Sequence, residues 1–413
     1  MDPMMKLDHA LFIFTQEYPY GKGETFIENE LIELSPQFDT IYLFPLKKTS
    51  VARQIPIANA NVVTLFENEC NNKWGMLLSN FFVFTGILVN EWKALGFSKF
   101  SSSFSSLKSI LLLNLHRAKV LNQYIQSGNI KQVSYYSFWT DDWATILSIL
   151  TLRKQIVGFV SRVHGYDLYE YRWPSKLIPF RNFQLKQVSK IIAASKDGLN
   201  YLKKHYPVYE NKFFLQHLNV FDKGLNPFDS NDSEFTIVSC SNIISLKRVH
   251  LIPELLKEND LKIRWIHFGD GDKVLEQQLK EDIAKLPTNI SVELRGYISN
   301  PDLIRFYQTN KVNLFIHLSE TEGGVPLVLQ EVASFGIPML ATDVGGIPEI
   351  VNEETGILIP ANFSKAEAAE KIKTFASSPL NTPSFRANVK SYWDRFFNAK
   401  ENSIKLYNLL VQK

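Results

Sequence analysis

Apolar and polar residues alternate along the chain in short blocks that predict strands followed by helices. In the first half, apolar runs predict strands at Ala10–Phe14, Thr40–Phe44, Gln132–Tyr136, Gly158–Val163 and Lys190–Ala194. The second half repeats the pattern, with strands predicted at Phe235–Ser239, Ile263–Phe268, Ser291–Leu294, Val312–Ile316 and Met339–Thr342. Strands that alternate with helices indicate an α/β protein with parallel sheets covered by helices on both faces.

The length of 413 residues exceeds one typical domain and fits two of ordinary size. The polar stretch Asn226–Ser233 separates the two blocks of strands and is the best linker candidate. We therefore expect one doubly wound domain over residues 1–225 and a second over residues 234–389. In open sheets of this kind, ligands bind outside the carboxyl ends of the strands.

The amino-acid composition limits the kinds of partner and the cellular location that we expect for this protein. A net charge of +3 gives no reason to expect a nucleic-acid partner. The two cysteines, Cys70 and Cys240, have no neighbouring metal ligands, so we expect neither a disulfide framework nor a zinc site. Scarce cysteine and the lack of a secretory signal pattern at the N-terminus favour a reducing, cytoplasmic location.

The segment Trp74–Trp92 carries no charged residue before Glu91, but polar residues and Gly86 interrupt it, so a membrane-spanning helix is not expected. Two interpretations stay open. The segment forms a buried or partly buried helix, or it lies in a membrane interface, where Lys93 and Lys99 would meet anionic headgroups at the inner face of the plasma membrane.

The most informative stretch follows the strand predicted at Val312–Ile316. A turn containing Glu322, Gly323 and Gly324 leads to a helix that opens at Pro326 and runs through Phe335. Glycines at the start of a helix, beside a carboxylate, suit a bound pyrophosphate with a polyol next to it. The amides near Gly324 and Val325 and the helix dipole favour the anion, and Glu322 and Glu331 can accept hydrogen bonds from sugar hydroxyls. The alternative is an ordinary strand–helix–strand unit with surface glutamates.

This arrangement resembles the donor site of the family 4 retaining glycosyltransferases of GT-B fold. In that family seven residues separate two glutamates around a glycine-containing helix entry, whereas eight separate Glu322 from Glu331 here. We place the extra residue at Gly323-Gly324. The resemblance implies that Glu322 holds the donor sugar, with Glu320 as a competitor, and that Glu331 holds the nucleotide ribose. It also implies two domains facing across a cleft, with the C-terminal residues 390–413 crossing back to complete the first domain.

Other second-domain motifs fit the same resemblance. The family has Gly-Arg, a spacer and Lys-Gly after the first strand; here Ser241-Asn242 replaces Gly-Arg, and Lys247-Arg248 follows. We expect Lys247 to contact the diphosphate and Arg248 to replace the missing charge, unless both are solvated surface cations. The remaining expected donor contacts are Gly269 and Gly271, in a loop that also permits a dinucleotide turn, and Arg295 and Tyr297.

In the first domain, the loop Ser161–Tyr169 resembles the family's His-containing loop that reaches the donor sugar. The resemblance gives His164 a catalytic, sugar-positioning role and places Arg162 and Asp167 on the acceptor side. The stretch Tyr18–Phe26 resembles the family's first loop, where the chain approaches the acceptor, through Gly21, Lys22, Gly23 and Glu24. A packing role remains the alternative for this stretch and for the aromatic residues that end at Trp139.

The resemblance implies a retaining glycosyltransferase that moves a sugar from a nucleotide-diphosphate donor to a hydroxyl of a glycan or lipid-linked acceptor in cell-surface polysaccharide synthesis. A UDP-sugar is favoured and a GDP-sugar is possible. We expect neither a metal nor a cofactor. Two other classes stay open: a non-catalytic nucleotide-sugar-binding subunit of a membrane glycan assembly, and an NAD-dependent oxidoreductase, which the Gly269-x-Gly271 turn permits but which lacks a third glycine in register.

Overall fold

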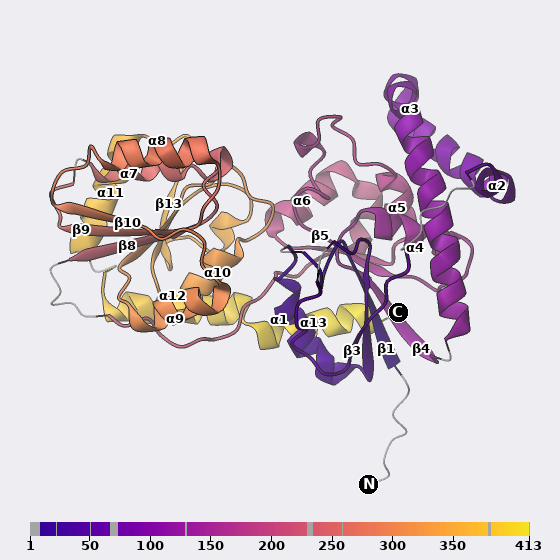
Figure 1. Cartoon of the computed structure of the whole chain (residues 1–413), viewed down its shortest axis with the longest axis horizontal. Coiled ribbons are helices and arrows are strands. Elements are labelled where there is room, and N and C mark those ends of the chain that lie inside the picture. The colour runs from indigo at the N-terminus through magenta and orange to yellow at the C-terminus, as the bar shows by residue number, and fades with distance from the viewer. Residues whose placement is uncertain are drawn as a thin grey trace, which may run out of the picture. The chain divides into compact units, whose positions relative to one another are not determined.

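The computed structural model describes residues 9–21, 23–49, 51–66, 73–128, 130–228, 234–257, 259–378 and 381–412. The chain divides into two compact units (Figure 1): unit 1 contains residues 1–216 and 403–413, and unit 2 contains residues 217–402. Each unit has one parallel sheet with helices on both faces, which confirms the predicted α/β, doubly wound fold class.

The sheet of unit 1 has seven strands, and every neighbouring pair is parallel. Their spatial order is β3 (Ala60–Val62), β2 (Thr40–Pro45), β1 (His9–Thr15), β4 (Gln132–Ser137), β5 (Val160–Val163), β6 (Lys190–Ala193) and β7 (Phe213–Leu215). All five strands predicted in this half are present. The edge strands β3 and β7 were not predicted, because three residues are too few to show a periodicity.

Alternate residues of β1 face opposite layers of unit 1, as a strand requires. Phe12 and Phe14 belong to a core shared with helices α3 (Phe81–Ser127), α4 (Asp142–Leu152) and α5 (Arg181–Gln187). Leu11 and Ile13 belong to a core shared with α1 (Ile27–Leu34) and the C-terminal α13 (Ala399–Val411).

The other helices of this part of the chain are α2 (Lys73–Ser79) and α6 (Lys196–His205). Three 3-10 helices lie at Ser35–Gln37, Glu170–Arg172 and Pro207–Lys212.

Helices α2 and α3 contain the apolar segment Trp74–Trp92. Gly96 has a left-handed backbone (φ 73°) that interrupts the helical geometry of α3. Ile87 and Leu88 are buried in the unit 1 core, but Phe82 and Phe97 are 87% and 77% exposed. The segment thus packs on one side and presents aromatic side chains to the surroundings on another. Among the described residues, no helix is long and apolar enough to cross a membrane.

The sheet of unit 2 has six parallel strands in the order β10 (Ile290–Leu294), β9 (Ile263–Phe268), β8 (Phe235–Cys240), β11 (Leu314–His317), β12 (Met339–Thr342) and β13 (Gly356–Ile359). The five predicted strands are present, and β13 was not predicted. One face is covered by α9 (Asn300–Thr309), α10 (Leu327–Ser334) and α12 (Pro383–Phe397). The other is covered by α7 (Ile252–Leu256), α8 (Lys273–Ile283) and α11 (Lys365–Ser377). Three 3-10 helices lie at Ser245–Lys247, Val249–Leu251 and Ile347–Glu349.

The units divide at different residues from those expected. Residues 217–225 belong to unit 2, because the chain there packs on the end of α12: Val220 forms a parallel bridge with Asn398. Helix α12 also belongs wholly to unit 2, since Trp393 and Phe397 are buried in its core. Only residues 403–413 join unit 1, where Leu406 and Leu410 pack in the α1 layer.

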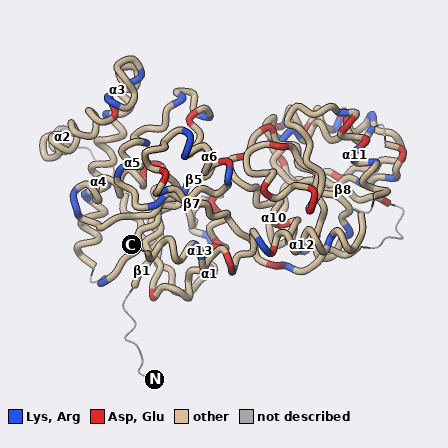
Figure 2. Tube along the Cα trace, turned by 180° about the vertical axis from the view of Figure 1, so that it is seen from behind, with Lys and Arg blue, Asp and Glu red and all other residues tan. Residues whose placement is uncertain are grey.

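Strand order reverses between β1 and β4 in unit 1 and between β8 and β11 in unit 2. At such a point the connections leave in opposite directions, so the carboxyl ends of the two strands open a crevice where ligands bind in open α/β sheets. Acidic and basic residues are dispersed over both units (Figure 2), in keeping with the small net charge.

Candidate functional site

At the reversal point of unit 2, two side chains contact the carboxylate of Glu322, and a third contacts one of these two. Lys247 ends the 3-10 helix Ser245–Lys247 that follows β8, and its ammonium group donates to Oε1 of Glu322. His317 ends β11, and its Nε2 lies 2.9 Å from the same oxygen. Ser319 places its Oγ 2.9 Å from the same imidazole nitrogen. Two separate strand ends therefore position one carboxylate.

The partners of Glu322 set its charge. Burial raises the pKa of Glu322, but the hydrogen bond from His317 and the charge of Lys247 outweigh it and lower that pKa to about 2. Burial lowers the pKa of His317 despite the neighbouring carboxylate, so the imidazole is neutral at pH 7. The site thus holds an ionised carboxylate, an ammonium cation and a neutral donor. Glu320, the competitor for this position, is exposed.

The turn that carries Glu322 is fixed by the glycine pair before the 3-10 helix Ile347–Glu349. A Cβ at Gly345, whose φ is +53°, would lie 2.2 Å from the carbonyl oxygen of Glu322. A Cβ at Gly346 would lie 2.6 Å from the carbonyl carbon of Gly324. Only glycine allows this approach. The expected donor residues Gly323 and Gly324 are half-buried in this turn, at the start of α10, and the side chain of Val325 belongs to the core.

Arg248 has different partners from the diphosphate that we expected. Its guanidinium donates to the carbonyl oxygens of Leu318 at 2.6 Å, Ala361 at 2.8 Å and Ser319 at 3.1 Å. Arg248 therefore joins the end of β11 to the chain after β13. The positive charge of Arg248 therefore lies near Glu322, but its hydrogen bonds are made to backbone carbonyl groups.

The glycines of the Gly269-x-Gly271 loop also serve backbone packing. A Cβ at Gly269 would lie 2.0 Å from the carbonyl oxygen of Ser241, and one at Gly271 would lie 2.3 Å from that of Ile243. The amide of Gly269 donates to Gly296 at 2.7 Å. Three loops that follow β8, β9 and β10 are thus joined. The same contacts explain this loop without a dinucleotide.

Glu331 lies on α10 and accepts a hydrogen bond from Asn300 at 2.7 Å. Burial raises the pKa of Glu331 to about 7, although Asn300 and the charge of Lys223 act in the opposite direction. A carboxyl group that titrates near neutrality is suited to a ligand that supplies hydroxyl donors.

Of the other expected donor residues, Arg295 donates two hydrogen bonds to the carboxylate of Glu293, and the side chain of Tyr297 is 76% exposed.

In unit 1, His164 lies just beyond β5, packed against aromatic rings. The ring of Trp139 is 4.2 Å away, and Phe138 and Phe26 are 5.1 and 5.5 Å away between centroids. Burial and the charge of Arg162 lower the pKa of His164 well below its usual value, so it is neutral. Neither ring nitrogen has a hydrogen-bond partner among the described residues. Buried polar atoms are usually satisfied, so this histidine is suited to a ligand contact.

The structure corrects the roles expected for Arg162 and Asp167. Arg162 is fully buried and donates to Glu30 at 2.6 Å, to the hydroxyl of Tyr136 at 2.7 Å and to the carbonyl oxygen of Gln216 at 2.9 Å. Asp167 is buried and accepts from the amides of Thr140 and His164 at 2.9 and 2.8 Å. Arg162 is a core ion pair, and Asp167 holds the loop of His164. The hydrogen bonds of both side chains are thus made within unit 1 or to the chain that follows it.

The expected role of Glu24 is corrected for the same reason. Its carboxylate accepts from the amides of Gln16, Glu17 and Tyr18 at 3.0, 2.7 and 2.8 Å, and so fixes the loop after β1. Gly21 has a left-handed backbone, with Glu17 where a side chain would project, whereas Gly23 faces open space. Lys22 lies outside the described residues.

Sequence reasoning missed Asp141, at the reversal point of unit 1. Gln16, after β1, donates to its Oδ2, and the hydroxyl of Tyr166 donates to the same oxygen at 2.9 Å. Burial and the charge of Asp142 raise the pKa of Asp141 to about 7. Trp139 and Tyr166 lie beside it, 4.9 Å apart. His317 was also missed, although a histidine at the end of an apolar strand was a usable signal.

No group of three or more His, Cys, Asp and Glu side chains is arranged to hold a metal ion within the described part of the chain. The polar groups of both reversal points instead contact one another, the backbone or aromatic rings.

Comparison with known protein families finds a match within unit 2. Residues 221–392 match the family described as glycosyl transferases group 1. The match covers most of unit 2 and less than half of the chain, and we call this matched region the group 1 domain. The N-acetyl-alpha-D-glucosaminyl L-malate synthase of Bacillus anthracis is 24% identical over 269 residues, which are 60% of this chain and 68% of that protein. The putative colanic acid biosynthesis glycosyltransferase WcaL of Escherichia coli is 27% identical over 171 residues, but these cover only 40% of this chain and 41% of that protein.

Solved structures extend the likeness to the first unit. The chain superposes on the structure of Anabaena HepE in complex with UDP with a TM-score of 0.67 at 15% identity, covering 98% of this chain and 100% of that one. The lipopolysaccharide outer core galactosyltransferase WaaB gives 0.67 at 13% identity, with 97% and 98% covered. The group 1 domain and unit 1 together therefore have the fold of the GT-B glycosyltransferases, as the sequence predicted.

Proposed function

We propose that this chain is a retaining glycosyltransferase. It moves a sugar from a nucleotide-diphosphate donor, a UDP-sugar in preference to a GDP-sugar, to a hydroxyl of a glycan or lipid-linked acceptor in cell-surface polysaccharide synthesis. The observation that carries the proposal is the ionised Glu322, held by Lys247 and His317 in the turn before α10. Relatives named for colanic acid and amylovoran biosynthesis, and a neighbour solved with UDP, support it.

In this proposal the group 1 domain binds the donor. The start of α10 supplies backbone amides and the positive end of a helix dipole for the diphosphate. An ammonium group has three N–H donors, so Lys247 can hold both Glu322 and a diphosphate oxygen. Glu322 accepts from hydroxyls of the sugar, and Glu331 accepts from the ribose. Arg248 supports the site by holding Leu318 and Ser319.

Transfer with retention follows from attack on the face that the leaving group vacates. The bond between the anomeric carbon and the diphosphate oxygen breaks, the acceptor oxygen bonds to that carbon, and the acceptor proton passes to the departing diphosphate. Negative charge develops on the diphosphate in the transition state. Lys247 and the amides near Gly324 and Val325 stabilise it without the need of a cofactor.

Unit 1 supplies the acceptor-side groups in this proposal. His164 offers its two buried ring nitrogens to the reacting sugar. The aromatic rings of Trp139 and Tyr166, together with the carboxylate of Asp141, suit the binding of a second sugar. The exposed rings of Phe82 and Phe97 suit a peripheral contact with the membrane that carries a lipid-linked acceptor.

The experiment that tests the proposal is a thermal-shift screen of the purified protein against UDP, GDP, ADP, their sugar conjugates and NAD. A ligand at a hundred times its dissociation constant adds about 2.7 kcal/mol to the free energy of unfolding. We expect a selective shift with UDP or a UDP-sugar that is lost in Glu331→Ala. A shift with NAD alone contradicts the proposal. A donor that binds but is never hydrolysed or transferred supports the alternative of a non-catalytic binding subunit, which the extra residue between Glu322 and Glu331 keeps open.

A further inference from the structure

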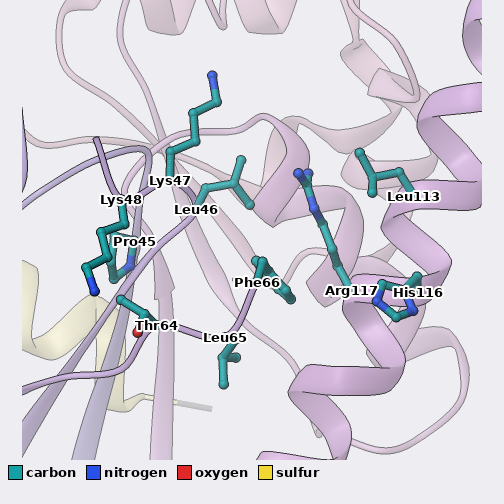
Figure 3. A pocket seen from close by; sticks show the side chains of 10 residues that line it. All are labelled: Pro45, Leu46, Lys47, Lys48, Thr64, Leu65, Phe66, Leu113, His116 and Arg117. Carbon is teal, nitrogen blue, oxygen red and sulfur yellow. The ribbon is translucent and has the colours of Figure 1, made fainter. Parts of the chain in front are cut away.

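Unit 1 has a pocket of about 540 Å³ next to its acceptor-side groups (Figure 3). Its walls come from the end of β2 and the residues after it, from the chain after β3 and from the second half of α3. Figure 3 shows Lys47 and Arg117 extending toward the same side of the pocket, with Leu46 between them and Phe66 beside Arg117, while Lys48 points the other way. The lining residues are Pro45, Leu46, Lys47, Lys48, Thr64, Leu65, Phe66, Leu113, His116 and Arg117.

The pocket is lined by positive charge. Three of its lining residues are cations, and its described walls contain no Asp or Glu. Arg117 also contacts Asp142, whose Oδ2 lies 3.4 Å from Nη1 of the guanidinium. The Arg117 guanidinium is held in place by the Phe66 ring, 5.5 Å from its centroid. Burial, then the charges of Lys119 and Arg117, lowers the pKa of His116, as expected in a positive environment.

The pocket adjoins the strand-order reversal of unit 1. The amide of Lys47 donates to the carbonyl oxygen of Gln16 at 2.9 Å, and the side chain of Gln16 donates to Asp141. On the other side, Arg117 contacts Asp142, the residue after Asp141. Two continuous links thus connect the cationic pocket to the carboxylate that lies beside Trp139 and Tyr166.

We propose that this pocket binds a phosphate group carried by the acceptor. The inference rests on the proposed function and specifies its acceptor as a phosphate-bearing glycan. The planar guanidinium of Arg117 matches two phosphate oxygens, and Lys47 adds a mobile point charge. The volume exceeds the need of one phosphate and lies in the usual range for ligand pockets, so it also accommodates the group to which the phosphate is linked.

The test is a titration of the full chain with inorganic pyrophosphate, read at the imidazole resonance of His116 at fixed pH. A local signal is needed because pyrophosphate also suits the donor site of unit 2. We expect a saturable shift whose dissociation constant rises about ten-fold or more in Lys47→Ala and in Arg117→Gln. Lys131→Ala, an exposed cation beside the amino end of β4, is the matched control and should bind like the original protein. A His116 resonance that does not respond, or equal binding in Lys47→Ala, overturns the proposal.

Lys47 is exposed, so the Lys47→Ala variant should fold normally. This variant alone therefore decides the test if Arg117→Gln is unstable. Vesicles then identify the source of the phosphate. Sedimentation with phosphatidylglycerol vesicles, lost in Lys47→Ala and absent with phosphatidylcholine, assigns the site to a lipid headgroup. Pyrophosphate binding without such sedimentation assigns it to a phosphate on the glycan or its carrier. The first result overturns the assignment of the phosphate to the acceptor, and the second supports it.

The two proposals fail differently. Binding of UDP to unit 2, measured by thermal shift, should be unchanged in Lys47→Ala and lost in Glu331→Ala. If UDP binds but His116 never responds to pyrophosphate, only the phosphate site is overturned. If no nucleotide binds, the proposed function fails on its own ground.

Discussion

Lys247 and Glu322 lie 75 residues apart in the sequence and share a hydrogen bond at the carboxyl edge of the unit 2 sheet. Because β8 and β11 are neighbours in that sheet, the residues that follow them meet. The pair joins the cation expected at the diphosphate to the carboxylate expected at the sugar. In the proposed donor site, a change in either side chain would therefore affect both halves of the nucleotide-sugar.

Removal of the Lys247 ammonium should slow transfer more than it weakens binding. We expect Lys247→Ala to lower turnover about a hundred-fold or more, by analogy with loss of one oxyanion donor. Glu322 would also lose a partner, so the sugar should be held less firmly. The measurement is kcat and KM with a UDP-sugar, with Lys257→Ala, an exposed lysine on the same unit, as control. Near-normal turnover of Lys247→Ala would remove this residue from the mechanism.

Nucleotide-sugar binding should depend on pH through Glu331. Burial raises its pKa to about 7, so its carboxyl group titrates near neutral pH. Ribose hydroxyls donate to the ionised form, so binding should lower the pKa and release a proton. Affinity should therefore be highest above pH 7 and fall by up to about ten-fold per pH unit below it.

Calorimetry with UDP-glucose at pH 6, 7 and 8, in buffers of different ionisation enthalpy, measures both the affinity and the proton release. Glu331→Gln cannot titrate and should give a weaker, nearly flat profile. A steep profile that persists in Glu331→Gln would mean that another group is responsible.

Asp141 should govern the acceptor and not the donor. With its pKa near 7, an acceptor hydroxyl that donates to the ionised carboxylate should give a kcat/KM for acceptor that rises through pH 7. Asp141→Asn should lower this value about ten-fold or more and flatten the profile. Asp142→Asn is the informative comparison: without the neighbouring charge, the pKa of Asp141 falls, so the midpoint should move to lower pH. An unchanged acceptor profile in Asp141→Asn contradicts this role.

Arg162 should affect stability and leave nucleotide binding unchanged. It and Glu30 are buried, 0% and 1% exposed, so Arg162→Met leaves a buried carboxylate without its cation. Loss of one partner of a buried pair costs about 3–5 kcal/mol of the free energy of unfolding. The double variant Arg162→Met with Glu30→Leu should recover much of that loss, since no uncompensated charge remains.

Denaturant unfolding measures the stability of these variants, and a thermal shift with UDP measures binding in those that stay folded. The single variant Glu30→Leu completes the double-mutant cycle, which separates the interaction between Arg162 and Glu30 from the effect of each substitution alone. If Arg162→Met were as stable as the original protein yet inactive, the acceptor role first expected for Arg162 would be restored.

The sequence by itself determined most of the strands along the chain, their division between two parallel sheets and the position of the glycine-rich turn. These features depend on neighbouring residues: a strand such as β1 shows its alternation within seven positions, and Pro326 and Gly336 mark the limits of α10 locally. Short edge strands such as β3 and β7 have too few residues to carry that signal. The sequence favoured Glu322 over Glu320, and only the structure showed that Glu322 contacts Lys247 and His317.

Only the tertiary structure decided what each polar residue contacts. Arg162 finds Glu30 across 132 residues of sequence, and Asp141 finds Gln16 across 125. A charged residue at a strand end looks the same in the sequence whether it faces a ligand or a buried partner. Its role depends on desolvation and on hydrogen bonds from distant segments, and these exist only once parallel strands are paired. The cationic pocket formed by Lys47 and Arg117 arises in the same way, from three segments that the sheet order brings together.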